Sequence, residues 1–340
     1  MNFNIITILC SAWFVFILLA CGDKKTANET TQMGATGDPA IDQLTQKIAQ
    51  NPDDASLYAA RAGLFYEKEG YDEAIQDLQK ALSYDSTNVE YLHALADAYL
   101  DYYKSRQALE TMEKAVNFHP QRIPTLLKMS EFQLILKRYE ESMRTIDRVL
   151  RIDPQNADAY LMFGLNFKEK QDTIRAINSF QKAVEINPDL IDAWINLGQL
   201  HAGLGNKIAA QYFNTALTIA PNNVDALHAK AQYLQDNNDL NGAIEIYKKI
   251  NAVDPQYEEA YYNTGLLYLD LDSVTQAKKA FDVAIKVNPT FVEAYYFRGI
   301  AAEMQGNATQ AKADYEQALK LAPDYEAARE ALEGLISNMK

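Results

Sequence analysis

Large apolar and small residues recur along this chain in a pattern with a period of about 34 residues. Eight copies fill residues 55–325, and the first begins at Ala55. In each copy a large residue stands at positions 4 and 24 and a small one at positions 8 and 20. Residues three or four apart share a helical face, so positions 4, 8 and 11 form one apolar face and positions 20, 24 and 27 another. Each copy therefore predicts two amphipathic helices, a helix A over positions 1–14 and a helix B over positions 18–30.

Position 32 of each copy marks where helix B must stop. A proline there cannot continue a helix, so the chain turns. The intervals between these residues are all 34, except for 33 between Pro188 and Pro221. The series is Pro52, Ser86, Pro120, Pro154, Pro188, Pro221, Pro255, Pro289 and Pro323. A constant period of this length is typical of stacked copies of one supersecondary unit, which share a continuous core.

The small and large positions are complementary, as close packing of two helices requires. Position 8 is Ala, Ser or Gly in every copy: Ala62, Ala96, Ser130, Gly164, Gly198, Ala231, Gly265 and Gly299. Position 24 is always large: Leu78, Met112, Ile146, Phe180, Phe213, Tyr247, Phe281 and Tyr315. We interpret these positions, and the tyrosines at position 4, as core residues whose recurrence serves packing.

The pattern resembles the tetratricopeptide repeat. The fifth copy carries the family's residues in their places: Trp194, Leu197-Gly198, Ala209, Phe213, Ala216 and Pro221. The resemblance implies an all-α fold, a right-handed α-solenoid of about eight repeats. Departures are Ser86 at the proline position, Gln133 and His201 at the usually aromatic position 11, and one missing residue near the A–B turn of the fifth copy. We expect a local change of superhelical pitch there.

Partial units flank the repeats. Pro39 opens a segment with Ile41, Leu44 and Ile48 at helical spacing, which predicts a lone helix within residues 39–54. Residues 326–340 predict one further helix that caps the last repeat, with its apolar side toward the stack.

The first twenty residues contain no charged side chain. The apolar run is too short for a comfortable membrane span and is typical of a signal peptide. It ends in Leu18-Leu19-Ala20-Cys21-Gly22, which resembles the lipobox of bacterial lipoproteins. The resemblance implies a signal peptide over residues 1–20, a lipid on Cys21 and a flexible tether over residues 21–38. An uncleaved N-terminal anchor is the rival interpretation.

Composition reduces the number of functional classes that fit this protein. The net charge of −14 opposes nucleic-acid binding, which needs a basic surface. The only cysteines are Cys10 and Cys21, and the four histidines are far apart in sequence. We find no phosphate-binding glycine loop, nucleophile elbow or metal-binding histidine motif. The sequence therefore predicts no catalytic residues, no metal and no cofactor.

The family resemblance implies that helix A lines a concave groove, with positions 2, 5, 6, 9, 12 and 13 facing a bound partner. From the third copy onward several of these are apolar or aromatic, and contiguous exposed apolar residues often mark interaction sites. The candidate partner-binding residues are Leu161, Ile195, Asn196, His228, Tyr262, Asn263, Tyr296 and Phe297. Acidic residues at position 2 either stabilise the first turn of each helix A or form an acidic rim on the groove that would favour basic partners. An alternative is that some of these residues only pack against the next helix A.

The sequence thus predicts a non-catalytic, membrane-anchored scaffold of the bacterial cell envelope, in the outer membrane. It would bind protein or peptide partners, and a role in assembling envelope complexes follows by analogy alone. A self-assembling structural protein and an enzyme with a site built from distant side chains are the alternatives. The partner and the oligomeric state stay open.

Overall fold

In the computed structural model, residues 37–338 are described, and they form eighteen α-helices without any β-strand. Eight helices stand at the helix A place of the repeats. They are α2 (Ala55–Glu67), α4 (Val89–Asp101), α6 (Ile123–Ile135), α8 (Ala157–Glu169), α10 (Ile191–Gly203), α12 (Val224–Asp236), α14 (Glu258–Asp270) and α16 (Val292–Met304).

The B helices alternate with them. They are α3 (Tyr71–Tyr84), α5 (Ser105–Phe118), α7 (Tyr139–Ile152), α9 (Thr173–Ile186), α11 (Ala209–Ile219), α13 (Leu240–Val253), α15 (Val274–Val287) and α17 (Ala308–Leu321). The remaining two are terminal, α1 (Pro39–Gln50) and α18 (Glu326–Asn338). The predicted all-α solenoid is confirmed.

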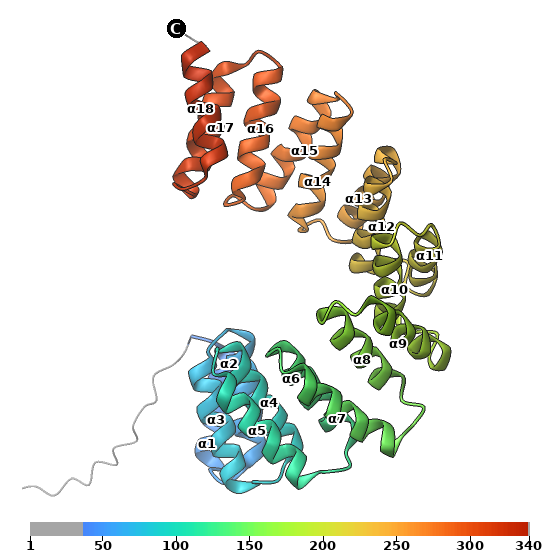
Figure 1. Ribbon diagram of the computed structural model, residues 1–340. Helices are drawn as coiled ribbons and strands as arrows, with labels where there is room; N and C mark the ends of the chain where they lie inside the picture. The colour runs from blue at the N-terminus through green and yellow to red at the C-terminus, as the bar shows by residue number, and fades with distance from the viewer. Residues whose placement is uncertain (1–36, 339–340) are drawn as a thin grey trace, which may run out of the picture.

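The helix pairs follow one another along a single curved path, with α1 and α18 at its two ends (Figure 1). Each helix packs on the one before it and the one after it. In addition, some A helices of neighbouring repeats contact each other directly: α6 contacts α8, α10 contacts α12, and α14 contacts α16. The path therefore curves toward the A helices, so these helices line its concave side.

Inside each repeat, position 8 of helix A is pressed against position 24 of helix B. A Cβ atom added to Gly164 would lie 2.4 Å from Cε1 of Phe180, and the same holds for Gly198 against Phe213 at 2.5 Å. Phe180 and Phe213 are almost fully buried. The small residue at position 8 therefore provides the space into which the large residue at position 24 fits.

The aromatic residues at position 4 do more than pack. The Trp194 Nε1–H donates to the carbonyl of Pro188 at 2.7 Å, and the Tyr58 hydroxyl donates to that of Pro52 at 2.9 Å. In each case the acceptor lies six residues earlier, in the turn that joins two repeats. The expectation that these residues are purely apolar core is therefore incomplete, since their polar tips also tie helix A to the preceding turn.

Every A–B turn holds one residue of left-handed backbone, at position 15. Six of these are not glycine: Glu69, Tyr103, Lys137, Gln171, Asn238 and Asp272. The other two are Gly205 and Gly306. The next residue donates its N–H to the carbonyl five residues back, as Lys104 does to Tyr99 at 2.7 Å, which closes the helix in the Schellman manner.

The residue missing from the fifth repeat is absorbed at the start of its B helix. Helix α11 has 11 residues, whereas the other B helices have 14, as in α9. Lys207 and Ile208 form a turn, and Ala210 donates its N–H to Lys207 three residues back. Ala209, Phe213 and Ala216 remain buried, so the core of the stack is unbroken.

The two terminal helices cover the ends of the stack. Asp38 caps α1 by accepting the N–H of Ala40 at 2.8 Å, and Ile41 is buried. At the other end, Ala328 and Leu335 of α18 are buried against the last repeat.

The predicted signal peptide, Cys21 and residues 21–36 of the tether lie outside the described residues. None of the helices within residues 37–338 combines the length and the apolar character that a membrane crossing requires.

Candidate partner-binding groove

An exposed row of carboxylates runs along the concave side. Its members stand at position 2, in the first turn of six A helices: Glu90, Asp158, Asp192, Asp225, Glu259 and Glu293. Acidic residues there complement the helix dipole. Glu90 is engaged by Arg122 of the next repeat at 2.8 Å. The row gives the rim of the groove negative charge.

Among the candidate residues of the fourth and fifth repeats, only Leu161 is partly accessible. Ile195 is 6% exposed and packs in the core between α10, α11 and α12, so the expectation that it points away from the core is wrong. Asn196 is also buried, where its amide N–H donates to the carbonyl of Asp192 at 2.8 Å. The inward turn of these two residues follows from the direct packing of α10 against α12.

A lysine from the preceding repeat covers the part of the groove that is formed by α10. Lys168 donates to Oδ1 of Asn196 at 2.6 Å and to Oε1 of Gln199 at 2.9 Å. Its ammonium group forms no salt bridge within residues 37–338, and burial lowers the pKa of Lys168 below the ordinary value. Lys168 was not among the predicted site residues, because its partners lie about thirty residues away in sequence.

The candidate residues of the last repeats gather into one aromatic cluster. The Tyr262 ring lies 4.9 Å from that of Phe291 and 5.8 Å from that of Phe297, between ring centroids. Tyr296 lies 5.0 Å from Phe297 and 5.4 Å from Tyr325. These rings are half-buried, so part of their apolar character is explained by packing between repeats, as the alternative interpretation held.

Polar atoms in this cluster remain available to a partner. Tyr262 and Tyr296 make no hydrogen bond through their hydroxyls within residues 37–338. Burial raises the pKa of Tyr262 to about 12, with the Glu293 carboxylate acting in the same direction, so the phenol stays neutral. Asn263 beside them is half-buried. The cluster therefore offers ring faces and hydroxyls next to an acidic rim.

His228 stands further along the groove, edge-on to two tyrosines. Its ring lies 5.8 Å from Tyr247 and 6.4 Å from Tyr257, between centroids. It also lines a cleft of about 420 Å³ between α10 and α12, together with Gln199, Gln232 and Asp236. The structure thus places His228 at an accessible part of the groove and adds glutamines that the sequence did not single out.

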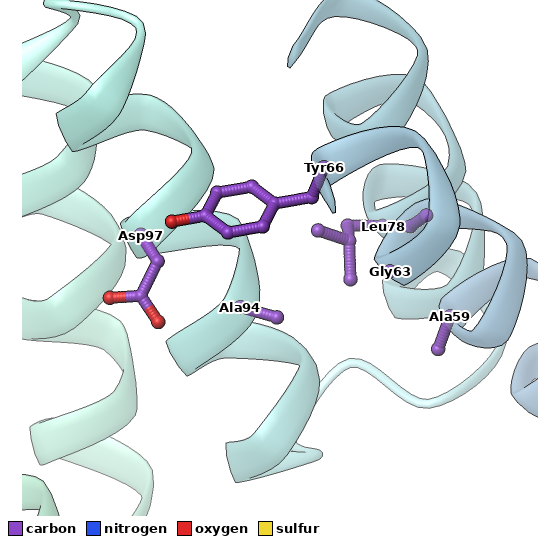
Figure 2. A pocket seen from close by; sticks show the side chains of 7 residues that line it. Ala59, Gly63, Tyr66, Leu78, Ala94 and Asp97 are labelled. Carbon is purple, nitrogen blue, oxygen red and sulfur yellow. The ribbon is translucent and has the colours of Figure 1, made fainter. Parts of the chain in front are cut away.

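A second, smaller pocket lies on the same side at the other end of the molecule, between α2 and α4. It has a volume of about 130 Å³ and is lined by Ala59, Ala62, Gly63, Tyr66, Leu78, Ala94 and Asp97. Figure 2 shows the Tyr66 ring extending from α2 toward the Asp97 carboxylate of α4, with Ala59 and Gly63 on the α2 side of the pocket and Ala94 on the α4 side. A search for large apolar residues misses such a pocket, because it exists where side chains are small.

The other histidines are dispersed. His93 contacts Thr125 at 3.1 Å, His119 contacts the carbonyl of Thr87 at 2.8 Å, and His201 stacks near Tyr212. Across residues 37–338, no three side chains of the metal-binding types come together to hold an ion.

Known repeat families match most of this path. Models described as Tetratricopeptide repeat match residues 191–223, 224–257 and 262–326, and a model described as TPR repeat matches residues 62–101 and 164–205. The segments 191–223 and 224–257 each span one A–B unit of the structure, whereas the other three begin inside an A helix, namely α2, α8 or α14.

Two curated relatives show how far the likeness reaches. The chain is 29% identical to BBSome complex member BBS4 of Bos taurus over 110 residues, which is 32% of this chain and 21% of that protein. It is 25% identical to Type IV pilus assembly protein PilF of Pseudomonas aeruginosa over 135 residues, 38% of this chain and 52% of that protein. The chain thus spans between about a fifth and about half of the length of these relatives.

Solved structures share the fold at low identity. The C-terminal part of a TPR repeat-containing protein from Cytophaga hutchinsonii superposes with a TM-score of 0.55 and 17% identity, over 72% of this chain and 99% of that one. A chain of the APC/C hetero-tetramer Cut9-Hcn1 gives a TM-score of 0.53 and 17% identity, over 87% of this chain and 58% of that one. The chain therefore carries tetratricopeptide repeats, stacked into an α-solenoid.

Proposed function

We propose that this protein is a non-catalytic scaffold that binds a protein or peptide partner in its concave groove. The observation that carries the proposal is the aromatic cluster of α14 and α16. There the hydroxyls of Tyr262 and Tyr296, which make no hydrogen bond within residues 37–338, lie in the same helices as the exposed Glu259 and Glu293. Aromatic residues in grooves often dominate binding energy. The partner it suits is an apolar segment flanked by basic residues, which the acidic rim attracts mainly by speeding association.

Charge reversal tests the rim without disturbing the core. Glu259→Lys and Glu293→Lys together change only exposed first-turn residues. Partners captured from detergent-solubilised membranes by crosslinking are expected to be depleted from this variant, and to be released from the original chain as salt rises. Glu113→Lys with Glu185→Lys, on the B helices α5 and α9, is the matched control.

A second variant tests whether the aromatic rings of Tyr262 and Tyr296 contribute to binding. Tyr262→Ala with Tyr296→Ala removes both rings, and a thermal melt must accompany it because both rings also contact their neighbours. Loss of the partner with an unchanged melt supports the groove. Retention of the partner by both variants would place its site elsewhere, on the B helices or the tether.

We also propose that Cys21 carries a lipid that anchors the scaffold to the bacterial envelope. The support is the apolar run before Cys21 and the polar stretch after it. A Pseudomonas relative named for type IV pilus assembly agrees with an envelope role. Cys21→Ser is expected to yield an unprocessed or unanchored chain, measured by membrane fractionation and mass spectrometry of the N-terminus. A mature, acylated Cys21→Ser protein would contradict the proposal.

A further inference from the structure

The pocket between α2 and α4 owes its shape to three small residues on the groove side of the first two repeats. Gly63 stands where a side chain would fill the space, and a Cβ atom added to it would meet no other atom within 4 Å. Ala59 and Ala94 form the neighbouring walls, and Leu78 of helix B lies behind them. A volume of about 130 Å³ accommodates an aliphatic side chain of a partner.

The rim of this pocket carries an unbalanced negative charge. Asp97 pairs with Lys128 of the next repeat at 2.7 Å. Asp101, one turn further along α4, accepts a hydrogen bond from the Tyr66 hydroxyl, and within residues 37–338 it pairs with no cationic side chain. Two carboxylates therefore face one ammonium group, beside walls that are mainly apolar.

Because Asp97 is partly buried, its negative charge is less well solvated than that of a surface carboxylate. Loss of solvent raises the pKa of Asp97 above its ordinary value although Lys128 opposes the shift, and the nearby Asp101 adds to it. An additional cation would therefore relieve repulsion in a partly desolvated place, where electrostatic interactions are stronger than in water.

We propose that this pocket takes the side chain of a lysine from a partner peptide. The methylene stem would lie along Ala59, Gly63 and Ala94, and the ammonium group would reach the carboxylates of Asp97 and Asp101. This chemistry combines an apolar stem and a charged tip, as the pocket combines apolar walls and a charged rim. The inference extends the proposed function, since it adds a subsite to the same groove, far from the aromatic cluster.

Methyl NMR of the full chain in detergent micelles tests the pocket with a small probe. The labelled methyl groups of Ala59, Ala94 and Leu78 report directly on its walls. N-acetyl-lysine N-methylamide is expected to shift these signals in a saturable way. The norleucine analogue has the same stem length without the charge, and it should bind about tenfold more weakly, as the loss of one charge-assisted hydrogen bond implies.

Two variants separate shape from charge. Gly63→Leu fills the pocket and should abolish the lysine-dependent shifts, while Gly334→Leu, at another uncrowded helix glycine, should leave them intact. Asp97→Asn and Asp101→Asn together should reduce binding of the lysine probe to that of the norleucine probe. Because the probe does not touch Tyr262 or Tyr296, a failure here is distinguishable from a failure of the aromatic groove.

Three results would overturn the proposal. The first is the absence of shifts at the three methyl groups. The second is equal binding of the lysine and norleucine probes, which would make the pocket a purely apolar one. The third concerns Lys24 and Lys25 of the chain itself: if Lys24→Gln with Lys25→Gln moves the same methyl signals without any probe, the occupant is the chain's own N-terminal segment.

Discussion

Cε1 of Phe281 lies so close to Gly265 that a Cβ atom on the glycine would be 2.4 Å from it. Gly265 lies in α14 at position 8 of the seventh repeat, and Phe281 lies in α15 at position 24 of the same repeat. The first repeat solves the same contact with a larger residue on one side and a smaller one on the other, Ala62 and Leu78. Between these two repeats, a larger residue at position 8 therefore accompanies a smaller one at position 24, and the reverse.

This exchange predicts strong coupling between the two positions. Gly265→Ala is expected to destabilise the protein by about 1–3 kcal/mol through overpacking, against its better helix propensity. Adding Phe281→Leu should recover part of the loss, with a coupling energy of about 0.5–3 kcal/mol in a double-mutant cycle measured by denaturant unfolding. Gly334→Ala is the control and should be neutral or stabilising. Strict additivity of the two changes would contradict the volume exchange.

The first repeat contains a buried ion pair at positions 7 and 23, and the eighth repeat has its counterpart in Arg298 and Asp314. Arg61 grips Asp77 through two hydrogen bonds of 2.7 Å, and its Nη1 also donates to Thr45 of α1. Removing only the arginine, as in Arg61→Leu, leaves a buried carboxylate without its partner and should cost about 3–5 kcal/mol.

The second repeat shows which pair of residues could replace the ion pair. There Leu95 and Thr111 occupy the positions that Arg61 and Asp77 occupy in the first repeat. Arg61→Leu with Asp77→Thr is therefore expected to unfold at a temperature much closer to that of the original chain. A double variant as unstable as Arg61→Leu alone would show that the loss of the bond to Thr45 dominates.

The left-handed turn residues offer a gain in stability. Tyr103 has φ 57° and is 93% exposed, so its side chain contributes little packing to offset the backbone strain. Tyr103→Gly is expected to stabilise the protein by about 0.5–1 kcal/mol, since relief of strain exceeds the extra chain entropy of glycine. Gly205→Ala should have the opposite effect, because an added Cβ there meets no atom and only the backbone is perturbed. Thermal melts compare the two, and a destabilised Tyr103→Gly protein would refute the strain argument.

Acid should destabilise the solenoid by protonating carboxylates that accept hydrogen bonds in the folded protein. The Arg175 side chain and the N–H of Arg175 hold the pKa of Asp172 below its ordinary value of 3.8, and hydrogen bonds likewise lower the pKa of Asp38, Asp54 and Asp72. A carboxylate with a lowered pKa in the folded state stabilises folding above pH 3.8, and this contribution is lost as pH falls through the folded value.

Asp172→Asn isolates one of these groups, because asparagine can still cap the helix but does not titrate. The melting temperature of the original chain should exceed that of the variant at neutral pH, and the difference should shrink as the pH falls below 3.8. A difference that is independent of pH would exclude the charge as its cause.

The sequence alone determined the architecture, because a repeated unit folds by contacts with its own neighbours. The spacing of Pro188 and Pro221 located the short repeat. The small residues at position 8 predicted that helix A lies close to helix B, where Phe180 and Phe281 stand. Local periodicity decides which face of each helix is buried, so the helices and their order followed from the pattern.

Only the tertiary structure decided which groove residues are accessible and where space remains. Ile195 and Asn196 stand at groove positions, yet α12 packs directly on α10 and covers them. The pocket beside Gly63 depends on what is missing from two neighbouring helices, and the pairing of Lys168 with Asn196 joins different repeats. Such features arise from the curvature between repeats, a sum of packing contacts among residues about thirty positions apart, which no local pattern of apolar residues encodes.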